Sequence, residues 1–309
     1  MELRRLRNFL AVGEALNFTK AAAQLRVGQP ALSRQVQDLE DEIGVDLLHR
    51  SPRGVTLTAE GKLFLDEVRD LLKRADESVE KVRALARGEY GELHVGYAPY
   101  PTVEILPPAL TAFQKAVPRV KLTLHDLSTD ELIAGLRDDT LELAIMVEPD
   151  SEQAAGIEFE VLRTYPVCVA LAPTHPLARL KSIHLEKLSA EPLVALRRRD
   201  YPEYYRNLQR VFAPLGVKPR IAVECDSGSS LLVEVEAGRG AALSIAAFEL
   251  VAGKRLVYRP LTGTTAVCSV GIARATKGDV TPAGERFCEI LRKTSRRKAM
   301  GEPKPRKIT

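Results

Sequence analysis

The chain has 309 residues, of which 45% are hydrophobic, and a formal net charge of +4. This length and composition suit a protein with two or three domains that each bury a core. There is no apolar leader and no run of about eighteen apolar residues, so we expect no membrane span and a cytoplasmic protein. The four cysteines form no CxxC or Cys/His cluster, which excludes a zinc-ribbon pattern and gives no support for a disulfide framework. No metal and no cofactor is expected.

The positive charge is concentrated at the C-terminal end. Residues 292–309 carry eight Lys or Arg and one Glu, a net charge of +7, so the rest of the chain sums to −3. Residues 295–309 contain two prolines and few apolar residues, and we predict a basic, disordered tail there. The basicity of the whole chain is therefore no argument for a DNA-binding surface.

Two short amphipathic patterns flank a tight polar break near the N-terminus. The first occupies residues 17–27, and the second repeats apolar residues from Leu32 to Ile43 at helical spacing. Gly28 allows a turn between them, and Pro30 suits a first helical turn. The exposed stripe of the second pattern is rich in Gln, Ser and Arg, which hydrogen-bond base edges and phosphates. The pattern predicts a helix-turn-helix, with a helical hairpin whose polar face is merely solvated as the alternative.

A basic segment with Pro and Gly follows at residues 48–57. We expect it to form a two-stranded wing that brings arginines to phosphate or to the minor groove. Apolar residues from Leu6 to Val12 supply a further helix for a three-helix core. The candidate DNA contacts are Thr19, Lys20, Gln29, Pro30, Ala31, Ser33, Arg34, Gln37, Arg50 and Arg53.

Residues 1–61 resemble the LysR-type transcriptional regulators, through the run FTKAAAQLRVGQPALSRQVQDLEDEIGVDLLHRSPRGVTLTAEG. The resemblance implies an N-terminal, all-α winged helix-turn-helix that binds double-stranded promoter DNA. It also implies RNA polymerase as a partner, and a homodimer that assembles into a homotetramer. The family usually has a serine where this chain has Gly28, which brings no side-chain acceptor to cap the recognition helix.

One uninterrupted helical pattern runs from Thr58 to Arg87. Thr58 can cap its start, and Gly88 can end it. The apolar stripe covers about three heptads, more than a sixty-residue domain can bury, so we predict a linker helix that pairs with a second copy. The alternative is a helix laid across its own C-terminal domain. The candidate dimerisation residues are Phe64, Val68, Leu71, Ala75, Val79 and Val82.

From residue 91 onward, strand-like and helical patterns alternate, which indicates α/β structure with parallel, doubly wound sheets. In a first unit we expect strands at 93–98, 120–124 and 141–147 and helices at 103–116 and 129–137. In a second unit we expect strands at 166–171, 193–196, 221–224 and 241–245 and helices at 201–212 and 231–237. A strand at 265–273 and a helix at 282–293 would return to the first unit.

The family resemblance implies that this α/β part is a two-lobed effector domain like the periplasmic binding proteins. We therefore expect a winged helix-turn-helix domain at 1–58, a linker helix at 59–90, an effector-binding domain at 91–294 and the tail at 295–309. Within the effector-binding domain, lobe I would comprise about 91–162 and 268–294, and lobe II about 163–267.

Ligands in open α/β sheets bind beyond the carboxyl ends of strands, where helix N-termini expose N–H groups. Four such segments carry hydroxyl or arginine side chains, which suits a small carboxylate or other anion. Each hydroxyl has an alternative role as a helix cap. The candidate effector contacts are Tyr100, Thr102, Ser128, Thr129, Arg197 and Ser229.

Catalytic motifs are missing from the sequence. It contains no G-x-S-x-G elbow, no phosphate-binding P-loop and no H-E-x-x-H pair, and the glycines at 238–240 lead into a strand pattern instead of a helix. We therefore expect no catalytic residue. The leading hypothesis is a bacterial transcriptional regulator, an activator or a repressor, that responds to a small molecule bound between two lobes. The alternative is a non-transcriptional small-molecule-binding or enzymatic α/β domain with an N-terminal helical docking module.

Overall fold

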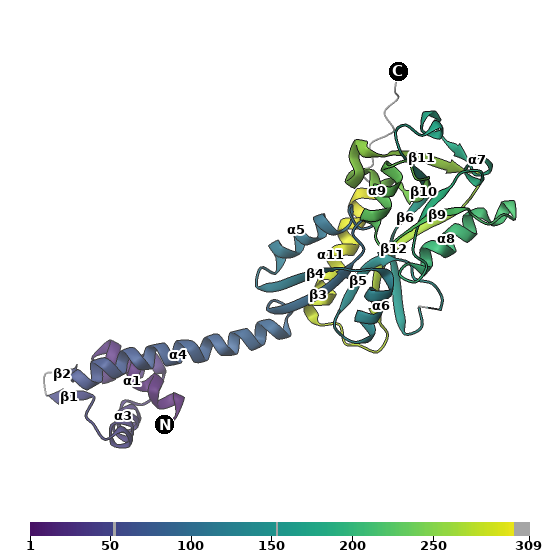
Figure 1. Ribbon diagram of the computed structural model, residues 1–309. Helices are drawn as coiled ribbons and strands as arrows, with labels where there is room; N and C mark the ends of the chain where they lie inside the picture. Colours follow the sequence, from purple (N-terminus) through teal and green to yellow (C-terminus); the bar gives the residue numbers. More distant parts are fainter. Residues whose placement is uncertain (52–53, 153, 300–309) are drawn as a thin grey trace. The chain divides into compact units, whose positions relative to one another are not determined.

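The computed structural model describes residues 1–51, 54–152 and 154–299. The chain divides into two compact units, Met1–Ala84 and the part from Leu85 onward (Figure 1). Each unit has its own core and is described by itself. In the described part of the chain, no helix combines the length and the apolar character needed to cross a membrane.

The first unit is a winged helix-turn-helix, as the sequence predicted. Its elements are α1 (Leu3–Ala15), α2 (Phe18–Leu25), α3 (Gln29–Ile43), β1 (Leu48–Ser51), β2 (Gly54–Leu57) and α4 (Ala59–Ala86). Asn17 caps α2 by accepting a hydrogen bond from the Lys20 amide at 2.9 Å. The core contains Phe9 and Leu32, and β1 pairs with β2 antiparallel to form the wing.

Thr58 joins the wing to α4, and this confirms the predicted cap. The Thr58 hydroxyl accepts a hydrogen bond from the Gly61 amide at 2.8 Å and donates one to the Asp46 carbonyl at 2.9 Å. A Cβ atom at Gly61 would lie 1.9 Å from the Leu47 carbonyl oxygen, so only glycine allows this close approach. Helix α4 then runs for 28 residues, and Gly88 follows its end with a positive φ.

The second unit contains an eight-stranded sheet in the order β4-β3-β5-β12-β6-β11-β7, with β10 also paired to β6. A separate parallel pair consists of β8 and β9. The strands of the large sheet are β3 (Gly91–Tyr97), β4 (Val120–Asp126), β5 (Leu143–Val147), β6 (Ile157–Leu171), β7 (Ile183–His184), β10 (Ala242–Ile245), β11 (Val257–Thr262) and β12 (Val267–Ala275), and those of the pair are β8 (Leu193–Leu196) and β9 (Ile221–Cys225).

The direction of the strands corrects the expectation of wholly parallel sheets. Strands β4, β3 and β5 are parallel, but β12 is antiparallel to both β5 and β6. Strand β6 begins nine residues before the predicted start at Pro166. The sequence pattern did not indicate its first half as a strand, because charged residues interrupt the apolar residues there. Strand β12 pairs with β5 in lobe I and with the long strand β6. Strand β6 also pairs with β10 and β11 in lobe II. The two long strands therefore connect the lobes.

Helices cover both faces of the lobe I sheet. Alternate residues of β5 enter opposite cores: Leu143 and Ile145 pack with α5 (Leu106–Ala116) and α11 (Pro282–Ala299), and Ala144 and Met146 pack with α6 (Thr129–Arg137). Lobe II contains α7 (Leu185–Ser189), α8 (Pro202–Phe212), α9 (Gly228–Glu236), α10 (Glu249–Ala252) and 3-10 turns at Pro176–Arg179, Ala213–Leu215, Ala246–Phe248 and Gly253–Arg255. Helix α11 extends five residues into the predicted tail, and residues 300–309 of that tail lie outside the described residues.

Candidate DNA-binding and effector-binding sites

The start of α3 presents most of the predicted DNA contacts to solvent. Gln29, Pro30, Ala31, Arg34 and Gln37 are exposed, as are Thr19 and Lys20 at the start of α2. No side chain caps α3 at Gly28, so the amide groups of its first turn have no side-chain acceptor there. An exposed helix start with free N–H groups can bind phosphate, while the Gln and Arg side chains can reach base edges.

Arg50 and Ser33 bind to each other within the protein. The Arg50 guanidinium donates to the Ser33 hydroxyl at 3.2 Å and pairs with the Glu40 carboxylate at 2.8 Å. It also lies over the Phe18 ring, 5.3 Å from its centroid. Arg50 is therefore held in place on the wing, and Glu40 offsets its charge. Arg53, the other predicted wing contact, lies outside the described residues.

Glu40 is a residue that the sequence reasoning missed. Its side chain is 3% exposed, and its Oε1 accepts hydrogen bonds from the Leu47 and Leu48 amides, both at 2.9 Å. One buried carboxylate thus ties α3 to the first strand of the wing and to Arg50. The signal was an acidic residue at position 40, four residues after Val36, on the apolar face of the recognition helix.

The exposed apolar stripe of α4 is shorter than predicted. Val68 is 2% exposed, and the Phe64 ring lies 5.4 Å from the Phe9 ring, so both pack into the core of their own unit and are not available to a second copy. Leu71, Val79 and Val82 are exposed, at 43%, 49% and 68%, and Ala75 is half-buried.

A cavity of about 350 Å³ lies between the two lobes. Lobe I contributes residues 98–101 after β3, Asp126 at the end of β4 with Leu127 and Thr129 after it, and Val147 at the end of β5. Lobe II contributes the first two turns of α8, the start of α9 at 227–229, and side chains from β10. The carboxyl ends of three parallel strands and the N-termini of two helices therefore meet at the cavity, as expected for an α/β ligand site.

Three of the six predicted effector contacts line this cavity: Tyr100, Thr129 and Ser229. The Tyr100 ring lies 5.1 Å from the Phe248 ring. A Cβ atom at Gly228 would lie 2.4 Å from the Tyr100 ring, so a larger residue at the start of α9 would displace this aromatic side chain. Thr129 donates a hydrogen bond to the Glu203 carboxylate at 2.9 Å.

The other three predicted contacts lie elsewhere. The Thr102 side chain is buried and donates to the Ala98 carbonyl at 2.6 Å. Ser128 caps α6 in a reciprocal capping box with Glu131. The Arg197 guanidinium is half-exposed and pairs with Asp200 at 2.9 Å. Ser128 thus serves as a helix cap, the Thr102 hydroxyl serves a local hydrogen bond to the backbone, and Arg197 is not one of the residues lining the cavity.

The cavity lining is acidic. Burial raises the pKa of Glu203 to about 7, although the Thr129 hydroxyl partly opposes this rise. Burial also raises the pKa of Asp126, and the neighbouring Glu131 carboxylate adds to the effect. Of the described residues that line the cavity, none is Lys or Arg. The described lining therefore contains no basic side chain that could neutralise the anionic effector expected from the sequence.

Glu203, Asp126 and Tyr201 are lining residues that the sequence reasoning missed. The only signal for Glu203 was its position four residues before Asn207 and eight before the core residue Val211, on an inward face of the predicted helix. The four cysteines are buried, and burial raises the pKa of the Cys168 and Cys268 thiols to about 12, so these two are inert thiols.

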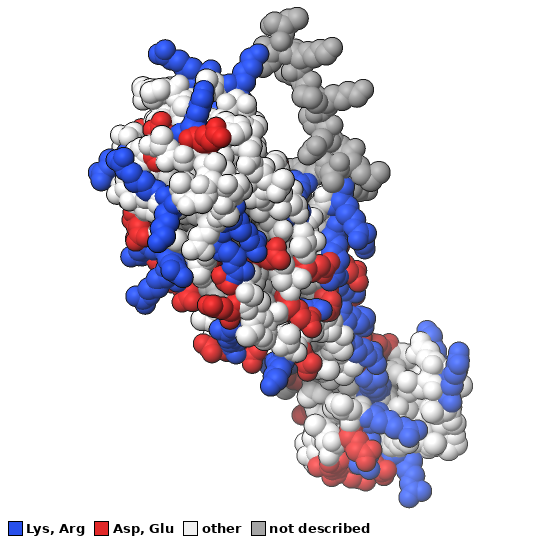
Figure 2. Space-filling model, turned by 90° about the vertical axis from the view of Figure 1, so that its right-hand side faces the viewer, with Lys and Arg blue, Asp and Glu red and all other residues white. Residues whose placement is uncertain are grey.

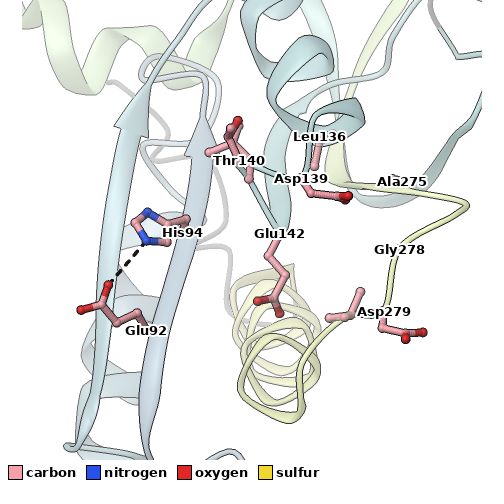
Figure 3. A pocket seen from close by; sticks show the side chains of 11 residues that line it. Glu92, His94, Leu136, Asp139, Thr140, Glu142, Ala275, Gly278 and Asp279 are labelled. Carbon is pink, nitrogen blue, oxygen red and sulfur yellow. Dashed lines mark ion pairs between the residues drawn. The ribbon is translucent and has the colours of Figure 1, made fainter.

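A second pocket, of about 360 Å³, lies in lobe I beside the start of α11 (Figure 3). Two of its four carboxylates, Glu142 and Glu92, already serve structural contacts. Glu142 accepts hydrogen bonds from the Thr281 amide at 2.8 Å and the Thr281 hydroxyl at 2.7 Å, and Glu92 pairs with Lys121 at 3.1 Å. Among the described residues, no group of His, Cys, Asp or Glu side chains could hold a metal ion.

Charged side chains of both signs are mixed on one face of the second unit (Figure 2). Figure 2 shows basic and acidic residues interspersed on the face of this unit that it presents, without a continuous basic field. This distribution agrees with the charge count, which placed the excess of Lys and Arg after residue 291. Among its described residues, this face of the α/β unit therefore has no basic stripe of the kind that binds nucleic acid (Figure 2).

Two family models match the chain. The LysR substrate binding domain matches residues 86–296, and the bacterial regulatory helix-turn-helix protein of the lysR family matches residues 3–62. The transcriptional regulator AlsR of Bacillus subtilis (strain 168) is 35% identical over 240 residues, which are 78% of this chain and 79% of AlsR. The regulator TcbR of Pseudomonas sp. (strain P51) is 31% identical over 96% of this chain and 100% of its own.

Solved structures of full length are also similar. The crystal structure of full-length CbnR complexed with its target DNA superposes with a TM-score of 0.80 at 30% identity, over 96% of this chain and 100% of CbnR. The crystal structure of CbnR, described as a LysR family transcriptional regulator, gives a TM-score of 0.82 at 31% identity, over 94% of this chain and 100% of CbnR.

Proposed function

The chain belongs to the LysR family of bacterial transcriptional regulators, and we propose that a small molecule bound between its two lobes controls how it binds promoter DNA. It is a DNA-binding regulator with an effector-binding domain, and the family does not consist of enzymes. The observation that carries the proposal is the interlobe cavity, where residues from three strand ends and two helix starts converge. A regulator of bacterial promoters would act in the cytoplasm.

Effector binding would act through the angle between the lobes. The long strands β6 and β12 connect them, so a ligand that contacts both sides of the cavity favours one angle over others. Along the chain, α4 is the covalent route from the DNA-binding unit to the effector-binding unit. A change in the second unit of each subunit would then alter the spacing of two DNA-binding units and their contacts with DNA and RNA polymerase.

Assembly into a homodimer would use the exposed stripe of α4. Leu71, Ala75, Ser78 and Val82 follow one another at intervals of four, three and four residues, which is the spacing of a coiled-coil seam. A dimer with two-fold symmetry would read an inverted repeat, and a homotetramer would bind two such sites.

DNA binding is tested with the full chain and a fragment of the DNA upstream of its gene. Removing two base contacts at about 1–3 kcal/mol each predicts at least a tenfold loss of affinity for the double variant Gln29→Ala with Arg34→Ala. Lys181→Ala, on an exposed loop of lobe II, is the matched control and should bind as the parent does. Unchanged affinity of the double variant would contradict the assignment of α3 as the recognition helix.

Effector binding is tested by filling the cavity. Ser244 lines it from β10 and is 8% exposed, so Ser244→Leu places extra apolar volume inside. Compounds that raise the melting temperature of the parent chain and change its DNA affinity should do neither for this variant. If the responses of the variant and the parent are equal, the effector does not bind in this cavity.

A further inference from the structure

Glu203 has one carboxylate oxygen that the protein leaves unsatisfied. The side chain lies in the first turn of α8, lines the interlobe cavity and is 7% exposed. Its Oε1 accepts the hydrogen bond from Thr129, but its Oε2 is buried and has no hydrogen-bond partner among the described residues. A buried carboxylate oxygen without a donor is costly and rare in folded proteins. A ligand that supplies the donor would explain why it is tolerated.

The charges around Glu203 select the sign of that ligand. Asp126 lines the same cavity from the end of β4, and burial, followed by the charges of Glu203 and Asp126, raises the pKa of Tyr201 to about 12. When they are ionised, the Glu203 and Asp126 carboxylates give the cavity a negative potential. Since no described lining residue is Lys or Arg, an anion would meet like charges without a counter-ion, whereas a cation would meet two carboxylates.

The remaining walls are aromatic and apolar. Tyr100 and Phe248 pack against each other on one side, and Tyr204 and Leu231 belong to the same lining. Aromatic faces attract ammonium groups and also pack against apolar parts of a ligand. A volume of about 350 Å³ lies at the lower end of the range for small-molecule sites.

We infer that the effector is a small organic cation whose ammonium group donates to Glu203 Oε2 and whose apolar body packs on the aromatic wall. The inference rests on the proposed function, since it concerns the chemistry of the same cavity. It replaces the small carboxylate or other anion expected from the sequence, because the arginine invoked for that anion pairs with Asp200 outside the lining.

The inference is tested with three probes that share one ring: benzylammonium, benzyl alcohol and phenylacetate. Their binding to the full chain at pH 8 is measured by titration calorimetry. A charge-assisted hydrogen bond in a buried site predicts that benzylammonium binds about ten- to a hundredfold more tightly than benzyl alcohol, and that phenylacetate binds most weakly. Tighter binding of phenylacetate than of benzylammonium would overturn the inference.

Variants identify the carboxylate responsible. Glu203→Gln keeps the shape and an acceptor for Thr129 but removes the charge, so it should bind benzylammonium at least tenfold less tightly and lose the preference over benzyl alcohol. Glu186→Gln removes an exposed carboxylate of the same lobe and should bind all three probes as the parent does. Equal preference for benzylammonium in the Glu203→Gln variant and the parent would overturn the inference.

The outcomes separate this inference from the proposed function. If phenylacetate or benzyl alcohol binds best and Ser244→Leu abolishes that binding, the cavity is an effector site but the charge assignment is wrong. If none of the three probes binds, the charge assignment is likewise rejected. The proposed function is rejected only if the compounds that change DNA affinity act equally on Ser244→Leu and on the parent.

Discussion

Glu203 should make the stability of the second unit depend on pH. Burial raises the pKa of its carboxyl group from 4.5 to about 7 in the folded chain. In the unfolded chain the group is solvated and returns to its ordinary pKa. Between pH 4.5 and 7, the folded state therefore holds a proton that the unfolded state has released. The substitution Glu203→Gln removes this titration.

The sign and the size follow from the pKa difference. The folded pKa is the higher one, so the stabilisation is fully present below about pH 4.5 and is lost as the pH rises through 7. A difference of about 2.5 pKa units corresponds to about 3 kcal/mol in the free energy of unfolding. The Gln variant should therefore gain about 3 kcal/mol relative to the parent on going from pH 4.5 to pH 8.

Hydrogen exchange of the full chain without ligand measures this difference region by region. Peptides from β8 and α8 report the opening free energy of lobe II, and the comparison is made at several pH values from 5 to 8 after correction for the intrinsic exchange rates. Glu186→Gln, whose carboxylate is exposed, should follow the parent at every pH. If the Glu203→Gln variant and the parent give parallel pH profiles, the reasoning from burial is refuted.

Three further predictions concern the first unit. A Cβ atom at Gly28 would meet nothing closer than 3.9 Å, so the substitution Gly28→Ser can supply the missing cap of α3. It should raise the free energy of unfolding, measured by urea unfolding, by a few tenths of a kcal/mol. A lower free energy of unfolding would contradict this prediction. Glu40→Ala should lower the free energy of unfolding by about 3 kcal/mol in the same assay and weaken DNA binding, because it removes the buried acceptor that holds the wing. An unchanged urea midpoint would exclude that role. The double variant Leu71→Glu with Val82→Glu should sediment as a smaller species than the parent, while Lys73→Glu on the opposite face of α4 should not. Unchanged sedimentation of the double variant would exclude a dimer seam on α4.

Local rules in the sequence were sufficient for the elements whose pattern is self-contained. The predicted helix at 129–137 and the strand at 193–196 match α6 and β8 residue for residue. Thr58 marked the start of the long helix correctly, because a cap requires only a hydroxyl near the first amide groups of a helix. The helix-turn-helix and the wing could be predicted for the same reason, since each is built from residues close together in the chain.

Pairing between distant strands could not be predicted in this way. The first half of β6 alternates charged and apolar residues, and it becomes a strand because β12 pairs along its length. Strand β11 lies between β6 and β7 and was not predicted at all. The direction of a strand is set by its long-range hydrogen-bond partners, so the local pattern did not distinguish a mixed sheet from a parallel one.

Local patterns in the sequence were enough to assign the class of protein: a recognition helix with exposed Gln29 and Arg34, a long amphipathic helix, and an α/β effector domain. Which of the predicted side chains reach the cavity depends on how distant segments pack together in the tertiary structure. Tyr100, Thr129 and Ser229 reach the cavity, while Arg197 is neutralised by Asp200 beside it. Burial depends on every neighbour that packs around a group, so the local pattern could not show that the helix glutamate at 203 lines the cavity with one carboxylate oxygen that has no hydrogen-bond partner among the described residues.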